Sequence, residues 1–449
     1  MKALFGSCTT SLAVVLILCS GLLLARPDGG PNVPDEATKL NRRGLDQLHK
    51  KEYDQAIASF REALQIHPEY PDALDNLGKA LDAVGKDQEA VTEFDQAIRI
   101  APENATAYAD KGLALYNQGK YEQSAASYRQ ALEHHKDFSE AQNGLGASLL
   151  HLGRSEEAIA AFRSSIASNP KNADALENLG SALLEENKAA EALPYLRKAH
   201  ALRPDSPGAL ETYGSALDQA GQTNEAISAY HKFTSKFPDQ PAPWAHLGYL
   251  YYKSERYNKA VPALEKSLAL KPDQPDALVT LGLAEAAQGK LEEAIQAYEK
   301  CLALKPDEFN ALYSLGNAYY ARKDYARAAA AYEKACAQKP DSAEALAGLG
   351  ASQSAAEKFE EAARTYEKLV PMKPDDADVR FNFGAALFNT GNYQGAADNY
   401  RAAVRLNPAM AHAHYNLGMT LLRLNDPKSA QAEFAEAHRL DPSLSSPTK

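Results

Sequence analysis

Residues 309–342 read FNALYSLGNAYYARKDYARAAAAYEKACAQKPDS, and this stretch of 34 residues decides the fold. Leu312, Leu315 and Tyr319 recur at the spacing of one helix face, and a second stripe of small and apolar residues runs from 328 to 335. Turn-forming residues separate the corresponding stripes elsewhere in the chain. The stretch therefore predicts two antiparallel helices joined by a short turn.

The same pattern recurs along most of the chain. A glycine stands at 44, 78, 112, 146, 180, 214, 248, 282, 316, 350, 384 and 418, an unbroken interval of 34 residues. A proline follows 24 residues after each glycine, except that Lys136 takes its place in the third repeat. This period indicates stacked helix pairs and not the three globular domains that 449 residues would suggest. The predicted repeats are 37–70, 71–104, 105–138, 139–172, 173–206, 207–240, 241–274, 275–308, 309–342, 343–376, 377–410 and 411–444, followed by a tail at 445–449.

The repeated glycine and proline each have a structural reason. With positions numbered 1 to 34 in each repeat, the glycine stands at position 8, inside the first helix, where glycine costs about 0.5–1 kcal/mol relative to alanine. Close approach of the two helix backbones would explain why glycine stands there despite this cost. The proline at position 32 is expected to end the second helix. We therefore expect an irregular corner at Lys136, where the proline is missing.

With these offsets, the chain resembles the tetratricopeptide repeat family over all twelve repeats. The resemblance implies an all-α, right-handed α-solenoid of twelve helix-turn-helix units. It also implies that the first helices line a concave groove that holds extended peptides or elements of partner proteins. We expect one continuous superhelix without β-sheet.

Composition and motifs exclude several classes of function. The net charge is −11 and no run is rich in Lys or Arg, which argues against a nucleic-acid partner because phosphate binding needs clustered positive charge. Cys301 and Cys336 have no disulfide or metal-binding pattern, and small-residue packing explains them. No nucleotide-binding, hydrolase or zinc-protease motif is present. The sequence predicts a protein that is not an enzyme and holds no cofactor or metal.

The first 25 residues form a separate region. After Met1 and Lys2, the uncharged stretch 3–25 is long enough to cross a bilayer as a helix. It predicts either a cleaved signal peptide or an uncleaved membrane anchor, and both alternatives stay open. Either one would leave the repeats outside the cytoplasm, and it would be the chain's only contact with a membrane. Residues 26–36 read as a Pro/Gly linker.

The groove positions of the first helix differ between the two halves of the chain. If positions 4, 7, 8 and 11 pack inward, positions 2, 5, 6, 9, 12 and 13 face the groove. Acids at position 2 are set aside, because they stabilise the first helical turn whatever the ligand. The remaining acids all fall in the first half and form a predicted acidic groove of Asp75, Asp82, Asp110, Glu177, Glu185, Glu211 and Asp218. The predicted peptide-binding groove in the second half consists of Tyr249, Tyr252, Leu283, Tyr313, Asn317, Tyr320, Phe381, Asn382 and Phe388.

Two interpretations of this asymmetry remain. The residues at the groove positions could vary without any binding role, and the tyrosines could simply pack along neighbouring first helices. Alternatively, a basic segment of a partner lies in the acidic half, and an aromatic or aliphatic segment inserts near the repeats from 241 to 342. In the second interpretation, Tyr249, Tyr252, Tyr313 and Tyr320 flank an apolar saddle over repeat 275–308.

The function predicted from these features is a non-catalytic scaffold that binds partner proteins or peptides outside the cytoplasm. One alternative is an accessory or regulatory subunit of an envelope or secreted enzyme. Another is a structural homo-oligomer, because the repeat 411–444 is followed by no further helix that would cover its end.

Overall fold

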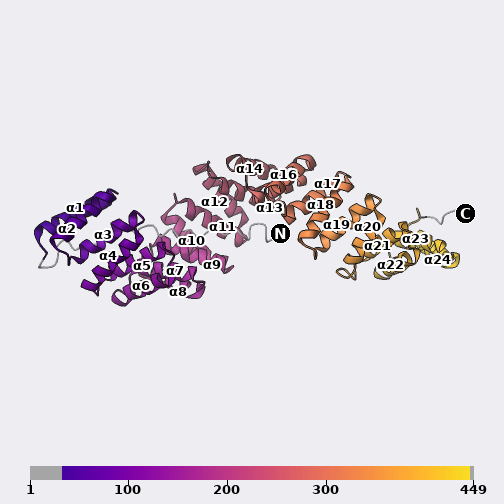
Figure 1. The fold of residues 1–449 in the computed structure, drawn as a ribbon. Coiled ribbons are helices and arrows are strands. Elements are labelled where there is room, and N and C mark those ends of the chain that lie inside the picture. Colours follow the sequence, from indigo (N-terminus) through magenta and orange to yellow (C-terminus); the bar gives the residue numbers. More distant parts are fainter. Residues whose placement is uncertain (1–32, 445–449) are drawn as a thin grey trace. The chain divides into compact units, whose positions relative to one another are not determined.

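The computed structural model describes residues 33–444, which divide into two compact units between Phe237 and Pro238. Figure 1 labels the helices in chain order. The first unit contains α1(Asp35–His49), α2(Tyr53–Ile66), α3(Pro71–Ala83), α4(Asp87–Ile100), α5(Ala105–Asn117), α6(Tyr121–His134), α7(Ser139–His151), α8(Ser155–Ser168), α9(Ala173–Glu185), α10(Ala189–Leu202), α11(Pro207–Gln219) and α12(Thr223–Lys236). The second contains α13(Pro241–Lys253), α14(Tyr257–Leu270), α15(Pro275–Ala287), α16(Leu291–Leu304), α17(Phe309–Ala321), α18(Tyr325–Gln338), α19(Ala343–Ala355), α20(Phe359–Leu369), α21(Ala377–Asn389), α22(Tyr393–Leu406), α23(Ala411–Arg423) and α24(Pro427–Leu440).

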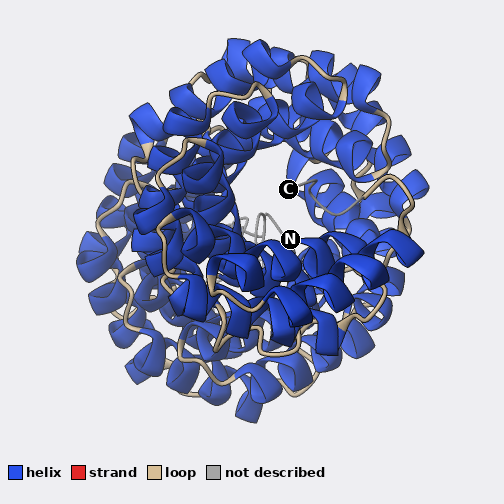
Figure 2. Cartoon of the chain, turned by 90° about the vertical axis from the view of Figure 1, so that its right-hand side faces the viewer, coloured by secondary structure: helices blue, strands red, loops and turns tan. Residues whose placement is uncertain are grey.

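The all-α solenoid of helix pairs is confirmed. Residues 33–444 contain helices joined by short loops and no strand, as Figure 2 shows. None of the helices in this part of the chain is long and apolar enough to cross a membrane. The predicted leader 1–25, most of the predicted linker 26–36 and the tail 445–449 lie outside the described residues.

Each repeat forms one helix pair whose two members have different neighbours. Odd-numbered helices occupy positions 1–13 of each repeat, with α1 beginning slightly earlier, and even-numbered helices begin at position 17. Within each unit every odd-numbered helix also contacts the next odd-numbered one, whereas the even-numbered helices lie farther from one another. The odd-numbered helices therefore form the inner face of each stack.

The glycine at position 8 receives the side chain at position 24 of the same pair. A methyl group built at Gly282 would stand 2.4 Å from a ring carbon of Tyr298, a separation that real Cβ atoms do not show. The same close approach recurs in every pair, against phenylalanine, tyrosine or leucine, at 2.3 to 2.9 Å in eleven pairs and at 3.1 Å at Gly112. The expected close approach is therefore between a helix backbone and a buried side chain of the partner helix, and less between two backbones.

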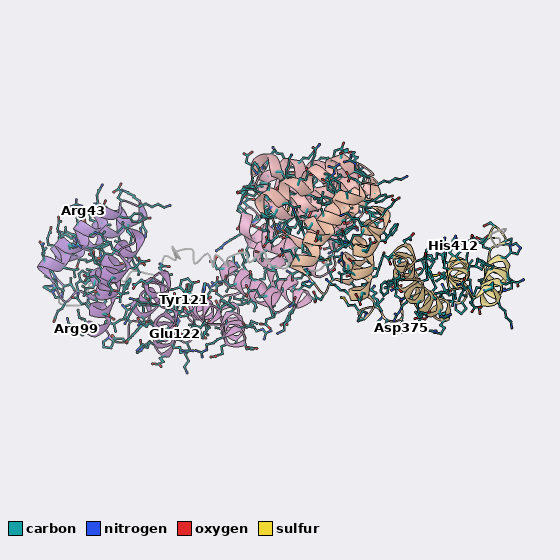
Figure 3. The ribbon with its side chains drawn as sticks, turned by 45° about the vertical axis from the view of Figure 1, so that its right-hand side comes forward. Arg43, Arg99, Tyr121, Glu122, Asp375 and His412 are labelled. Atoms are coloured by element: carbon teal, nitrogen blue, oxygen red, sulfur yellow. The ribbon has the colours of Figure 1, made fainter. Side chains whose placement is uncertain are left out.

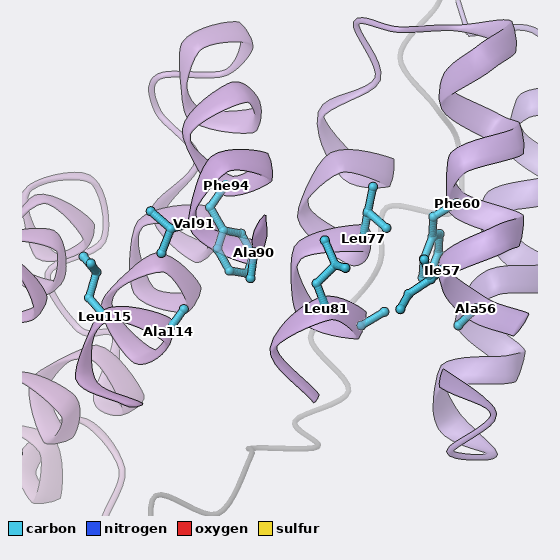
Figure 4. Close-up of a cluster of buried hydrophobic side chains, with 11 residues drawn as sticks. Ala56, Ile57, Phe60, Leu77, Leu81, Ala90, Val91, Phe94, Ala114 and Leu115 are labelled. Atoms are coloured by element: carbon cyan, nitrogen blue, oxygen red, sulfur yellow. The ribbon is translucent and has the colours of Figure 1, made fainter. Parts of the chain in front are cut away.

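The side chain at position 24 also begins the core between repeats. Figure 4 shows Phe60 and Ile57 of α2 facing Leu77 and Leu81 of α3. Phe60 is fully buried, and burial of a side chain of this size contributes about 1.5–3 kcal/mol. One residue thus holds its own pair together and helps to join that pair to the next.

The turn between the two helices of each pair has a fixed backbone shape. Position 15 has a positive φ in all twelve pairs, between 58° and 84°. Six pairs have glycine there, which adopts this left-handed conformation without steric cost. The other six have Lys51, Asn187, Glu255, Lys323, Glu357 and Asn425.

The irregular corner that we expected at Lys136 is not observed. Helix α6 ends at His134, at position 30, as the regular even-numbered helices do, and the His135 N–H donates to the Ala131 carbonyl. Proline at position 32 is therefore not required to end the helix. The irregular even-numbered helix is instead α20, which ends at Leu369, because Pro371 at position 29 cannot continue it.

Replacing Lys323 with glycine should stabilise the second unit. A left-handed residue other than glycine costs about 1–2 kcal/mol, and the greater backbone freedom of glycine in the unfolded chain offsets about 0.5–1 kcal/mol of that gain. We expect Lys323→Gly and Glu255→Gly each to raise the free energy of unfolding by up to about 1 kcal/mol in urea titrations. The reverse change, Gly289→Ala, should lower it. Destabilisation by both glycine variants would contradict the argument from backbone conformation.

Candidate functional site on the odd-numbered helices

The predicted acidic groove lies on α3, α5, α9 and α11 of the first unit, but its members have different surroundings. Lys79 of α3 places its ammonium 2.7 Å from an Asp75 oxygen and 3.0 Å from an Asp110 oxygen of α5. Asp75 is 6% exposed, so this carboxylate is largely inaccessible. Although burial favours the neutral amine, the Asp110 and Asp75 carboxylates hold the pKa of Lys79 above its usual range. These three groups form an ion-pair cluster between two helices.

Asp82, one turn beyond Lys79, is half-buried and forms no ion pair with the part of the chain that the structure describes. The Asn117 amide of α5 donates to its carboxylate at 3.3 Å. Burial raises the pKa of Asp82 to about 6. Its charged form is therefore disfavoured in the folded protein.

Three acids on α9 and α11, Glu177, Glu185 and Glu211, are more accessible than Asp75. Glu177 and Glu211 both stand at position 5 and are half-buried, and burial raises the pKa of both carboxyls. Glu185 is exposed near the end of α9, and Asp218 is half-buried on α11. The groove positions of this region thus carry negative charge in low-dielectric surroundings, which is where a basic ligand group gains most.

Two asparagines on the same face are used for packing. The Asn76 amide donates to Asn41 at 3.1 Å, and the Asn178 amide donates to Asn143 at 3.0 Å. Each bond joins adjacent odd-numbered helices, and all four side chains are buried. These side chains hold the inner face of the first unit together.

In the second unit, three of the predicted groove residues meet at one hollow. Tyr313, Asn317 and Tyr320 of α17 line a cavity of about 460 Å³ that opens over α19. The rest of the lining was not singled out from the sequence and comprises Tyr332, Ala343, Glu344, Ala347, Gly348, Ala351, Leu369, Lys373, Asp376 and Val379.

The other predicted groove residues of this unit lie away from the hollow. Tyr252 and Phe388 stand at position 12 and pack against the first aromatic residue of the following helix, with ring centroids 5.8 and 5.4 Å apart. Phe381 at position 5 packs against the Tyr400 ring at 5.7 Å. Tyr249 is half-buried on α13, Leu283 packs against the core around Tyr298, and Asn382 is exposed on α21.

Three local departures from the repeat pattern create the hollow. Ala347 and Ala351 leave the inner face of α19 without large side chains. Gly348 lacks the Cβ that would stand 2.6 Å from the Tyr332 ring, so this ring lies against α19. Helix α20 ends early, and the loop that follows it, which carries Asp375 (Figure 3), runs to α21 beside the opening. The small residues and Pro371 were visible in the sequence, but their convergence was not.

The described residues offer little support for other chemistry. Cys301 is fully buried and burial raises the pKa of its thiol to about 12, which disfavours the reactive thiolate. Within 33–444 no group of three or more His, Cys, Asp or Glu side chains is placed to hold a metal ion.

Comparison with known proteins gives a consistent family result. Family models for the tetratricopeptide repeat match residues 35–103, 109–172, 152–207, 183–248, 246–308, 279–343, 319–380 and 381–445. No curated protein sequence matches the chain.

Solved structures are similar in fold alone. The APC/C hetero-tetramer Cut9-Hcn1 shows 16% identity over 91% of this chain and 94% of that one, with a TM-score of 0.38. Yeast Tom70 shows 15% identity over 91% and 98%, with a TM-score of 0.37. MamA from Desulfovibrio magneticus RS-1 shows 23% identity over 38% and 97%, with a TM-score of 0.36.

Replacing Asp82 with asparagine should make stability less dependent on pH. Because folding raises the pKa of Asp82, its contribution is most favourable at low pH and declines as pH rises through about 6. We expect Asp82→Asn to match the wild type near pH 4 and to be about 1 kcal/mol more stable at pH 8, after discounting for solvent screening of a half-buried carboxylate.

Urea unfolding between pH 4 and 8 measures this difference. Asp341→Asn, in an exposed loop, is the control and should follow the wild type at every pH. If Asp82→Asn became less stable than the wild type as pH rises, the carboxylate would be stabilised in its charged form.

Proposed function

Because this chain belongs to the tetratricopeptide repeat family, we propose that it is a scaffold that binds extended segments of partner proteins on its odd-numbered helices. Proteins of this family generally act as non-catalytic interaction scaffolds, and the fold supports that role here. The observation that carries the proposal is the hollow of about 460 Å³ beside Tyr313, Asn317 and Tyr320. Tyrosines suit such a site because they combine a large contact area with a hydroxyl group.

The acidic face of the first unit supports binding of a basic segment of a partner. Glu177 and Glu211 stand at the same repeat position on neighbouring odd-numbered helices, α9 and α11, whose contact brings them to one region of the face. Binding to this region would be steered by charge and weakened by salt. The cluster around Lys79 supports this role less well, because its carboxylates already share an internal cation.

The remaining groove residues extend the proposed contact surface. Tyr249 and Tyr252 lie on α13, Leu283 on α15, and Phe381, Asn382 and Phe388 on α21. Each of these residues packs partly against its own unit or is exposed on an odd-numbered helix. We therefore propose that they make secondary contacts and that the main contact with the partner is at the hollow.

Two alternatives carry less support. An accessory subunit of an envelope or secreted enzyme would use the same face and differ only in its partner. A homo-oligomer through the repeat 411–444 would need an apolar end. Position 21 is Ile57 in the first repeat and contacts the next helix, whereas the corresponding Gln431 of α24 is exposed and polar.

We also propose that the repeats lie outside the cytoplasm, held or exported by the segment 1–25. Two positive charges precede an uncharged stretch long enough to cross a bilayer, and positive flanks stay on the cytoplasmic side. In intact cells with a permeable outer layer, added protease should digest the repeats while a cytoplasmic control protein survives. Full protection of the repeats until the membrane is broken would reverse this assignment.

Filling the hollow should remove peptide binding without unfolding the chain. We expect the wild-type protein to enrich a subset of a displayed library of random twelve-residue peptides, and Ala351→Trp to lose at least about tenfold in affinity for those peptides. Ala330→Trp places the same side chain at an exposed position of α18 and serves as the matched control. Equal binding by both variants, with unchanged melting temperatures, would place the peptide site elsewhere.

A further inference from the structure

We infer that the hollow over α19 takes one large, uncharged apolar side chain of an extended partner segment, whose main-chain carbonyl accepts a hydrogen bond from Asn317. The inference rests on the proposed function and adds the chemistry of the ligand at its anchor. It assigns roles in a site to Tyr332 and Gly348, neither of which was singled out from the sequence as a groove residue.

The walls of the hollow match an apolar side chain. Its floor consists of Ala347, Gly348 and Ala351, Val379 adds a small aliphatic surface from α21, and the fully buried Leu369 of α20 lies behind it. Rings of Tyr313, Tyr320 and Tyr332 form the other side. Tyr320 is 40% exposed, which leaves ring surface for a ligand to cover. A cavity of about 460 Å³ lies within the range of small-ligand sites and is roomy enough for one large side chain.

The side-chain amide of Asn317 can form a hydrogen bond with a ligand, and its contact with Tyr332 determines which amide atom is left for that bond. The Tyr332 hydroxyl donates to the Asn317 Oδ1 at 2.6 Å. With Oδ1 engaged by this hydroxyl, the Nδ2 group is the part of the amide that remains for a ligand. The Nδ2 group has no acceptor among the described residues, and Asn317 is exposed. Asn317 therefore offers its two Nδ2 donors, and a peptide carbonyl is the matching acceptor in an extended segment.

The charges at the opening favour an uncharged ligand. Lys373 and Glu344 carry opposite charges at the rim and are both exposed. The Asp376 carboxylate accepts from the Asp378 and Val379 N–H groups at 3.0 and 3.1 Å and so caps α21. No surplus positive charge lines the hollow, so a phosphate or a free carboxylate has no dedicated partner there.

Three small probes test the side chain and the hydrogen bond separately. N-acetyl-phenylalanine amide has the ring and the carbonyl, N-acetyl-alanine amide has the carbonyl without the ring, and toluene has the ring alone. Saturation-transfer NMR on the full chain measures each dissociation constant. We expect the phenylalanine probe to bind at least about tenfold more tightly than the alanine probe, as burial of a ring requires.

Variants then identify the groups involved. Ala351→Leu should weaken the phenylalanine probe and toluene at least about tenfold, and Ala330→Leu on α18 should change neither. Asn317→Ala should weaken the phenylalanine probe about threefold to tenfold, the range of one neutral hydrogen bond, and leave toluene unchanged. Tyr332→Phe retains the ring but frees the amide to flip, so it should also weaken only the phenylalanine probe. Melting temperatures separate these effects from unfolding.

The outcomes distinguish this inference from the proposed function. Equal affinity for the phenylalanine and alanine probes, or equal losses of phenylalanine probe and toluene in Asn317→Ala, would overturn the inference. If the displayed peptides nevertheless lose affinity in Ala351→Trp, the proposed function holds although the inference fails. If the probes behave as expected but no library peptide needs the hollow, the side-chain site stands and the proposed peptide scaffold fails.

Discussion

The contact between the glycine at position 8 and the side chain at position 24 is the constraint on which the rest of the structure depends. It sets the distance between the two helices of every pair, because a methyl group at Gly282 would overlap the Tyr298 ring. The same large side chain is buried against the next pair, as Phe60 is between α2 and α3. Once this contact repeats, the stack within each unit is determined. The remaining positions of the odd-numbered helices are then left for other contacts.

The turn at position 15 is a second constraint, and it acts on backbone shape more than on side-chain chemistry. Glycine, asparagine, lysine and glutamate all adopt the left-handed conformation there. The fold therefore accepts a local cost at residues such as Lys323 so that the second helix returns at the required angle. Proline at position 32 matters less than the repeat pattern suggested, since α6 ends correctly without it.

The inner face is partly structural and partly available. In the first unit, the Asn76–Asn41 bond and the Lys79 ion pairs join adjacent helices, which removes some polar groups from any role in ligand binding. Glu177 and Glu211 stay available. In the second unit, a hollow forms where small residues of α19 and a shortened α20 coincide. Departures from the repeat therefore mark the candidate site, and agreement with the repeat marks the scaffold.

The sequence by itself determined the helix pairs, their all-α stacking and the family, because a period of 34 residues constrains every pair in the same way. It also indicated Tyr313, Asn317 and Tyr320 as residues of the inner face. Only the tertiary structure decided that these three residues meet Gly348, Leu369 and Val379. The six residues belong to four different helices, and the spacing of those helices depends on packing. It also decided that Asp75 is buried against Lys79 whereas Glu177 is not paired in this way. Whether a polar side chain is available depends on its neighbours in space, and a sequence period fixes only its direction on a helix.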